Sequence, residues 1–512
     1  MTEKEYYLSL GYTEKQAKRI AALTFEEPPS PKEFLHEVGY MLKSAGRGRV
    51  MYYMAPEPAE CGAVLEECNC IDIEDIRTDT YEHFEDNGVK SVAAHPTSEF
   101  RATNNTAAAG ILINNFRNNA RINHDMVRTE ELLNMLPFDI ENPVGSKFAI
   151  NTDLTEKDGK KSLFIAIKSN PAVPKRQNIA LLIDTSGSMC SKVLQIRLTI
   201  ATVFSKMAEG DILSLITYSD EDHTFINGLV KTEKHDIDYV LDQLKKMYID
   251  GCTNGSAGIE TAYKIVSENF MKDGINRVIL VTDGDLNFGV TKKDGLEALI
   301  REKAKTGAYL SCIGTGLWNL QDDKLEVLAK NGNGNYFVLN DLEDAEELLN
   351  KRYNSLVYPV AKNVKVQVEF NPAVVKSYKQ IGYENRQLTR EQFRDDNVIS
   401  EPFGADSQCV AGYELYGEDK TNIQPLKYSK VEGGASDELC TIIVRFEDVE
   451  TGKVIEESKS VKNELTAGKN AKRMLMCYAI AECLRKNNQT LPNGENAIQL
   501  YMTMYKHPEF VE

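Results

Sequence analysis

The sequence contains no apolar stretch long enough to cross a bilayer, and its first residues lack the basic and apolar regions of a signal peptide. Its ten cysteines are scattered or lie in apolar segments, which is typical of a reducing compartment and not of a disulfide framework. Positive charge is scarce too, because 60 basic residues face 77 acidic ones. The net charge of −17 argues against binding to nucleic acid or to anionic membranes. These absences predict a cytoplasmic protein without a transmembrane segment.

Signatures of catalysis are missing as well. No H-E-x-x-H, P-loop or G-x-S-x-G motif occurs, and the seven histidines form no evident catalytic set. The apolar strand that ends in Asp184 is similar to those of phosphoaspartate hydrolases, but that chemistry needs a second acid where Ser186 stands. We therefore expect a protein that is not an enzyme. A metal-dependent hydrolase or phosphatase, and a structural scaffold with an incidental metal, are the alternatives.

The chain is too long, at 512 residues, for a single hydrophobic core. Its patterns change along the sequence and predict separate regions. The predicted regions are a helical N-terminal segment (1–80), a mixed α/β segment (81–174), an alternating α/β domain (175–357) and a β-rich domain ending in a helix (358–512).

The region from 175 to 357 alternates between apolar strands and amphipathic helices. The predicted strands are 179–183, 212–218, 278–282, 309–314 and 336–339. Strands that are apolar throughout and separated by helices predict a parallel sheet covered on both faces. This is a doubly wound, Rossmann-like fold, in which ligands bind at the carboxyl ends of the strands.

Strands of a different kind flank this domain, with apolar and polar residues in alternation. Such strands have one buried and one solvent-exposed face, as in a β-sandwich. The preceding pair (148–151 and 163–168) is too small to form a stable sheet alone, and similar strands resume at Val364. We therefore expect the flanks to pair into one β-sandwich domain into which the α/β domain is inserted.

Two helices are predicted in these flanks. The first covers 126–136 and carries Arg128, Glu130 and Glu131 on its polar side. The second covers 471–486 and is the one helix expected at the end of the β-rich domain.

A set of oxygen ligands stands at the ends of the apolar strands. Asp184, Ser186 and Ser188 form a D-x-S-x-S loop, Thr253 lies in a later loop, and Asp283 follows another buried strand. Carboxylates and hydroxyls are hard ligands that suit Mg²⁺, Mn²⁺ or Ca²⁺ rather than Zn²⁺. We predict that these residues line one cation site at the top of the sheet. A D-x-S-x-S turn alone would also be compatible with a helix cap.

The charge of this ligand set has a consequence for binding. Asp184 and Asp283 bring two negative charges against a divalent cation, and the hydroxyls bring none. The protein alone barely neutralises the ion and need not fill its coordination shell, so an outside carboxylate is attracted. We expect a partner protein to dock an Asp or Glu side chain there. The small number of carboxylates favours Mg²⁺ and Mn²⁺ over Ca²⁺.

The D-x-S-x-S loop, the loop threonine and the strand-end aspartate together resemble the metal-ion-dependent adhesion site (MIDAS) of von Willebrand factor A (VWA) domains. The wider chain resembles bacterial VWA proteins of the YfbK type. The matching runs are Asn87–Ala93, Val127–Leu132, Gly274–Asp285, Asn331–Tyr336, Ala361–Pro372, Ile381–Arg386 and Phe393–Asp396. The resemblance implies a binding module that acts as an adaptor or assembly factor. The partner that it implies is a MoxR-type AAA+ ATPase.

The chain departs from the family pattern in one segment. Relatives carry an acidic run, Ser-Ile-Asp-Val-Asp-Thr, where this sequence has Asn104 and Asn105. Any role of the two family carboxylates, in a second cation site or in an interdomain contact, therefore does not carry over directly.

Overall fold

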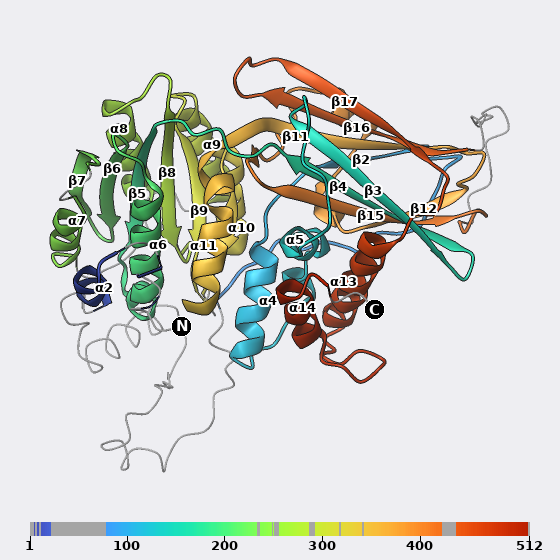
Figure 1. Cartoon of the computed structure of the whole chain (residues 1–512), viewed down its shortest axis with the longest axis horizontal. Coiled ribbons are helices and arrows are strands. Elements are labelled where there is room, and N and C mark those ends of the chain that lie inside the picture. The colour runs from blue at the N-terminus through green and yellow to red at the C-terminus, as the bar shows by residue number, and fades with distance from the viewer. Residues whose placement is uncertain are drawn as a thin grey trace, which may run out of the picture.

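Figure 1 shows the computed structural model, in which an α/β domain stands beside a β-sandwich with a layer of helices beneath it. The structure describes residues 12–21, 78–232, 236–247, 249, 255–285, 292–316, 319–339, 342–421 and 437–509, and Glu5, Leu8 and Ser9. No helix in these ranges is both long and apolar enough to cross a membrane.

The α/β domain is built on a sheet with the strand order β10-β9-β8-β5-β6-β7. Its strands are β5 (Gln177–Asp184), β6 (Ile212–Tyr218), β7 (Asp222–Val230), β8 (Ile275–Thr282), β9 (Tyr309–Gly314) and β10 (Tyr336–Val338). The expected doubly wound sheet is confirmed, but its edge strand β7 is antiparallel to β6. The turn between β6 and β7 is too short for the crossover that parallel pairing needs.

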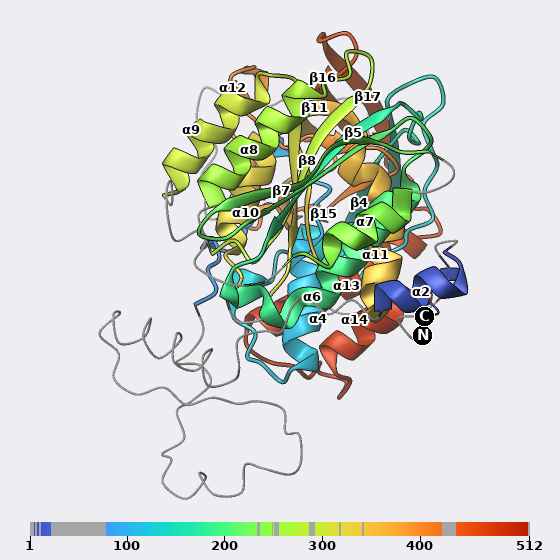
Figure 2. The same cartoon turned by 90° about the vertical axis from the view of Figure 1, so that its left-hand side faces the viewer.

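Helices cover both faces of this sheet, as Figure 2 shows. They are α6 (Val193–Lys206), α7 (Asp236–Leu244), α8 (Gly255–Glu268), α9 (Lys293–Ala304), α10 (Asp322–Asn331) and α11 (Leu342–Val357). Alternate residues of β5 point to opposite faces, so Leu181 joins the core with α6 and α11, and Leu182 joins the core with α8 and α10. Every residue of β5 is buried, which explains its uninterrupted apolar run up to Asp184.

The β-sandwich has two sheets, with the orders β1-β12-β15-β4-β3 and β13-β2-β11-β16-β17, and β14 pairs with β11. The first contains β1 (Lys90–Ser91), β3 (Phe148–Lys157), β4 (Lys160–Ser169), β12 (Ser377–Ile381) and β15 (Gln408–Tyr416). The second contains β2 (Thr97–Arg101), β11 (Pro359–Phe370), β13 (Gln387–Leu388), β14 (Phe403–Gly404), β16 (Glu438–Asp448) and β17 (Val454–Lys462).

Both sheets contain strands from before and from after the α/β domain. β4 pairs along its length with β15, where Leu163 lies opposite Tyr413, and β2 pairs with β11, where Phe100 lies opposite Val366. The two flanks thus form a single sandwich around a shared apolar core, as expected from their strands with one solvent-exposed face. The β3–β4 hairpin turns at Asp158 and Gly159, and both have positive φ, as a two-residue turn requires.

The helices beneath the sandwich also come from both flanks. They are α4 (Ala107–Arg117), α5 (Thr129–Met135), α13 (Lys469–Arg485) and α14 (Ala497–Lys506). The prediction of one C-terminal helix is wrong, because a second helix begins after Asn496, whose side chain accepts from the backbone N–H groups of Ile498 and Gln499. The predicted helix over 126–136 is shorter than expected, since the chain is extended at Arg128.

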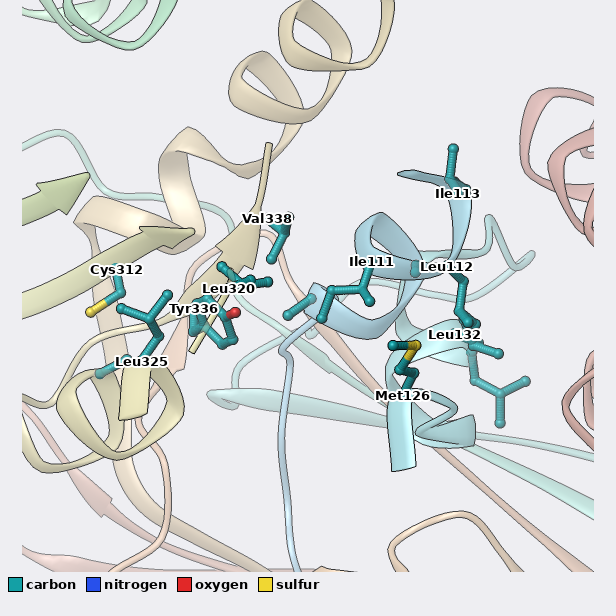
Figure 3. Close-up of a cluster of buried hydrophobic side chains, with 14 of the residues drawn as sticks. Ile111, Leu112, Ile113, Met126, Leu132, Cys312, Leu320, Leu325, Tyr336 and Val338 are labelled. Carbon is teal, nitrogen blue, oxygen red and sulfur yellow. The ribbon is translucent and has the colours of Figure 1, made fainter. Parts of the chain in front are cut away.

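One apolar core continues from the α/β sheet into this helical layer. Figure 3 shows Leu320 and Val338 of the α/β domain next to Ile111 of α4, with Leu132 of α5 farther along the same cluster. The same buried cluster extends to α13 and α14. The α/β domain and the helical layer are therefore packed as one body.

A buried group of charges lies at the same junction, and we call it the ion cluster. It consists of Arg128, Glu130, Glu131, Asp322, Glu326, Arg386 and Glu401. The predicted polar side of α5 is thus not a solvated side, because Arg128, Glu130 and Glu131 are each at most 3% exposed. The cluster joins α5 to α10 of the α/β domain and to the sandwich.

Other short helices complete the described chain. They are η3 (His124–Met126), η4 (Gly187–Lys192), η5 (Glu384–Arg386), α12 (Arg390–Arg394) and α2 (Glu14–Ala21). α2 belongs to the predicted helical N-terminal segment and packs on the α/β domain, where the Tyr12 hydroxyl donates to the carbonyl of Ala201 at 2.9 Å. Residues 22–77 of that segment lie outside the described chain.

Candidate metal centre

The two predicted metal-binding aspartates lie at the same edge of the α/β sheet. Asp184 is the last residue of β5, and Asp283 follows β8 directly. β5 and β8 are neighbouring parallel strands, with Ile183 opposite Val281, so their carboxyl ends meet. Ser186 is the N-cap residue of η4, and Ser188 lies within η4. Thr253 lies outside the residues that the structure describes, so its place in the site stays a prediction.

Asp184 is held by four donors and is fully buried. Its Oδ1 accepts from the backbone N–H of Ser186 at 3.0 Å and from the Ser186 hydroxyl at 2.7 Å. Its Oδ2 accepts from the Thr282 hydroxyl at 2.6 Å and from the Tyr218 hydroxyl at 3.2 Å. The Oγ atoms of Ser186 and Ser188 are 3.2 Å apart. One carboxylate and two hydroxyls are therefore gathered in one turn, as the motif predicts.

The charge of Asp184 is poorly compensated. Burial, together with the nearby negative charge of Asp283, raises the pKa of this carboxyl group to about 6, against the opposing effect of the hydrogen bonds from Thr282 and Ser186. A buried carboxylate is costly unless a positive charge accompanies it. The arrangement thus favours any added cation that reaches Asp184.

Asp283 is also fully buried, and it has a cationic partner. Its Oδ2 accepts from the Lys192 ammonium at 2.9 Å and from the Asn319 side-chain amide at 2.6 Å. Its Oδ1 accepts from the backbone N–H of Asp285 at 3.1 Å. Asp285 is half-buried, and this backbone contact places it next to the predicted ligand set, where its role stays open.

Lys192, Asn319, Thr282 and Tyr218 are absent from the set predicted by sequence. Lys192 is the last residue of η4, directly before α6, and Asn319 lies in a loop after β9, far from any recognisable motif. Thr282 had a detectable signal, because it directly precedes Asp283 at the end of a buried strand. The sequence contains no signal for the contact between Lys192 and Asp283, since only the folded sheet brings η4 next to the end of β8.

The site is connected to the helical layer through the loop that carries Asn319. The Asn114 side chain of α4 donates to the carbonyl of Gly316 at 3.1 Å, and the backbone N–H of Gln321 donates to the carbonyl of Asp283 at 2.8 Å. The next residue, Asp322, belongs to the ion cluster through Arg128. The loops around Asp283 are thus tied both to α4 and to α10.

The donor set fits a hard divalent cation. In the described chain, no group of three or more His, Cys, Asp or Glu side chains is placed to hold a metal ion. What the strand ends provide is two buried carboxylates and the hydroxyls of Ser186 and Ser188. Such a set suits a cation that keeps water or an outside ligand in part of its shell.

Asn104 and Asn105, the residues that depart from the family pattern, are both buried at the junction. The Asn104 amide donates to the Ser407 hydroxyl of the sandwich at 2.8 Å, and the Asn105 side-chain oxygen accepts from the backbone N–H of Tyr336 at 3.2 Å. These amides form an interdomain contact without charge.

Comparison with protein families covers most of the chain. Residues 178–351 match the von Willebrand factor type A domain, and residues 355–499 match the C-terminal region of the uncharacterized protein YfbK. Residues 75–162 match a further model described as von Willebrand factor.

Individual relatives agree with these matches. The uncharacterized protein YfbK of Escherichia coli (strain K12) is 33% identical over 371 residues, which are 69% of this chain and 64% of that protein. The inter-alpha-trypsin inhibitor heavy chain H3 of Mesocricetus auratus is 26% identical over 214 residues, which are 41% of this chain and 24% of that protein. The chain thus spans less than two thirds of the length of either relative.

A solved structure, the von Willebrand factor type A protein from Catenulispora acidiphila, is 15% identical, with a TM-score of 0.41 over 66% of this chain and 79% of its own. The assignment rests on the family models and the YfbK relative, not on this likeness. The chain belongs to the YfbK-type proteins with a VWA domain, and VWA domains are a family of protein-interaction and adhesion modules.

Proposed function

We propose that the protein is a non-enzymatic binding module that holds a divalent cation, Mg²⁺ or alternatively Mn²⁺ or Ca²⁺, and docks a carboxylate of a partner protein on it. Asp184, Ser186, Ser188 and Asp283 would hold the cation, with Thr253 as the member assigned by sequence alone. The observation that carries this proposal is the pair of fully buried carboxylates at neighbouring strand ends, beside two adjacent hydroxyls.

The charges of the site support carboxylate docking. A bound divalent cation supplies a Lewis-acidic position that an outside oxygen ligand can fill. The hydroxyl ligands add no negative charge, so the bound ion keeps its attraction for an acidic side chain. We propose that an Asp or Glu of the partner occupies that position and that the protein acts as an adaptor or assembly factor.

The partner class is proposed from the family resemblance. VWA proteins of this kind act beside MoxR-type AAA+ ATPases, and we propose such an ATPase as the partner of this protein. A hydrolase or phosphatase is a weaker candidate, because the hydroxyl two residues after Asp184 donates to that carboxylate and no second acid stands there.

Replacing Asp184 by Asn should abolish cation binding. The substitution keeps the shape of the side chain and removes one of the two charges that attract the ion, so we expect Mg²⁺ and Mn²⁺ affinity to fall roughly 100-fold or more. Calorimetric titration of the full chain measures this. The matched control is Asp273→Asn, an exposed residue at the opposite end of β8, which should bind as the wild type does. Equal affinity in the wild type and Asp184→Asn would refute the site.

Partner binding should depend on the same ion. We expect proteins captured from native cells by the tagged chain in Mg²⁺ to be released by EDTA, because the carboxylate contact needs the cation. Asp184→Asn should capture none of them, and Asp273→Asn should capture all of them. Capture that persists in EDTA with both variants would favour a scaffold with an incidental metal.

A further inference from the structure

Lys192 places a positive charge inside the site. Its side chain is 8% exposed, and its ammonium contacts Asp283 Oδ2 at 2.9 Å. The same ammonium contacts Asn319 Oδ1 at 3.2 Å, while the Asn319 amide donates to Asp283 Oδ2. The three side chains form a closed triangle in which Lys192 has two acceptors, one charged and one neutral.

The space around this ammonium is enclosed. Gly316 lies over it, and a Cβ built on Gly316 would stand 3.3 Å from the Lys192 Nζ and 3.0 Å from Asn319 Oδ1. The ammonium is thus not a solvated surface group that screening would weaken. Its charge acts at short range on anything that enters the site beside Asp283.

We propose that Lys192 sets the ligand preference of the site: its ammonium takes the place of the metal ion at Asp283 in the metal-free protein, and in the metal-bound protein it adds a positive charge that favours a carboxylate ligand. This inference rests on the proposed metal-binding function. It assigns Lys192 as a specificity-determining residue and not as a ligand.

The first consequence concerns the cation. An incoming divalent ion and the ammonium compete for Asp283, and like charges at short range repel each other in a poorly solvated site. Asn319 Oδ1 gives the ammonium a second acceptor, so Lys192 can leave Asp283 without losing every partner. Lys192 therefore weakens cation binding while it stabilises the metal-free protein.

The second consequence concerns the carboxylate. With the cation bound, the ion and the Lys192 ammonium carry three positive charges against the two negative charges of Asp184 and Asp283. The excess of one positive charge matches one carboxylate. Without Lys192, the same site would be neutral and would attract an acidic side chain less strongly.

The test is Lys192→Met, which keeps most of the side-chain volume and removes the charge. We expect Mg²⁺ to bind this variant about tenfold more tightly than the wild type in calorimetry. At saturating Mg²⁺, acetate should bind it several-fold more weakly, as followed by NMR. The melting temperature should fall in EDTA and be largely restored by Mg²⁺, because the ion replaces the lost ammonium. The control is Lys293→Met, because the Lys293 side chain is 37% exposed in its ion pair with Asp323 and its loss should change none of these values.

A merely structural role for Lys192 predicts a different result. The melting temperature would then fall equally in EDTA and in Mg²⁺, with unchanged or weaker Mg²⁺ affinity, and that would overturn the proposal. If Lys192→Met does not fold, Lys192→Gln, which keeps a donor for Asp283 without the charge, is subject to the same criteria. Absence of Mg²⁺ binding in the wild type would instead contradict the proposed function itself.

Discussion

Residues 358–512 expressed alone should not fold into the C-terminal half of the sandwich. In the native protein, β15 lies between β12 and β4, and β11 lies between β2 and β16. Removing the N-terminal flank takes β4 and β2 away, so two interior strands would become exposed edges. The fragment also loses Ile165 and Ile167, which are fully buried in the shared core.

We expect this fragment to show no cooperative thermal transition and poorly dispersed NMR spectra. Adding residues 78–175 as a separate chain should restore both, because that piece supplies β1 to β4 together with α4 and α5. The control is an added peptide of residues 78–145 only, which lacks the β3–β4 hairpin and should not restore the first sheet. A cooperative melt of residues 358–512 alone, unchanged by either addition, would refute a shared sandwich.

Replacing Arg386 by Met should destabilise the protein strongly. The guanidinium of Arg386 contacts Glu326 at 2.6 Å and Glu130 and Glu131 at 3.2 Å each, and it also contacts Glu401. The substitution leaves these buried carboxylates without their shared cation. Removing one partner from a buried ionic network costs about 3–5 kcal/mol, and we expect a loss of this size in the free energy of unfolding.

Chemical denaturation of the full chain measures this loss, and Arg394→Met is the matched control. The Arg394 side chain is 50% exposed in its ion pair with Glu456, so its loss should cost about 1 kcal/mol or less. A loss of similar size in both variants would mean that the ion cluster contributes no more than a surface pair.

The pH dependence provides a second criterion. Burial alone would raise the pKa of Glu326, but the charges of Arg386 and Arg128 outweigh it and lower this pKa to about 2. A carboxyl whose pKa is lowered in the folded state stabilises the protein above its unfolded pKa, and this contribution is lost as the pH falls through the folded pKa. The difference between wild type and Arg386→Met should therefore be largest above about pH 5 and shrink in more acidic solution.

The sequence alone determined the local features, because these depend on short-range patterns. The apolar runs of β5 and β8 and the helices between them identify a doubly wound sheet, and Asp184 and Asp283 are placed together by the rule that parallel strands share their carboxyl ends. Strands β3 and β4, each with one solvent-exposed face, also indicate a shared sandwich, since two strands are too few to form a stable sheet alone.

Only the tertiary structure decided which polar residues are buried and which groups they contact. Arg128, Glu130 and Glu131 have the spacing of a solvated helix face, yet they meet charges from α10 and the sandwich, far away in the sequence. Lys192 likewise reaches Asp283 across the sheet, a separation of 91 residues. The periodicity of a helix or strand indicates which side of the element is apolar. It does not indicate what covers the polar side, because that depends on how distant elements pack.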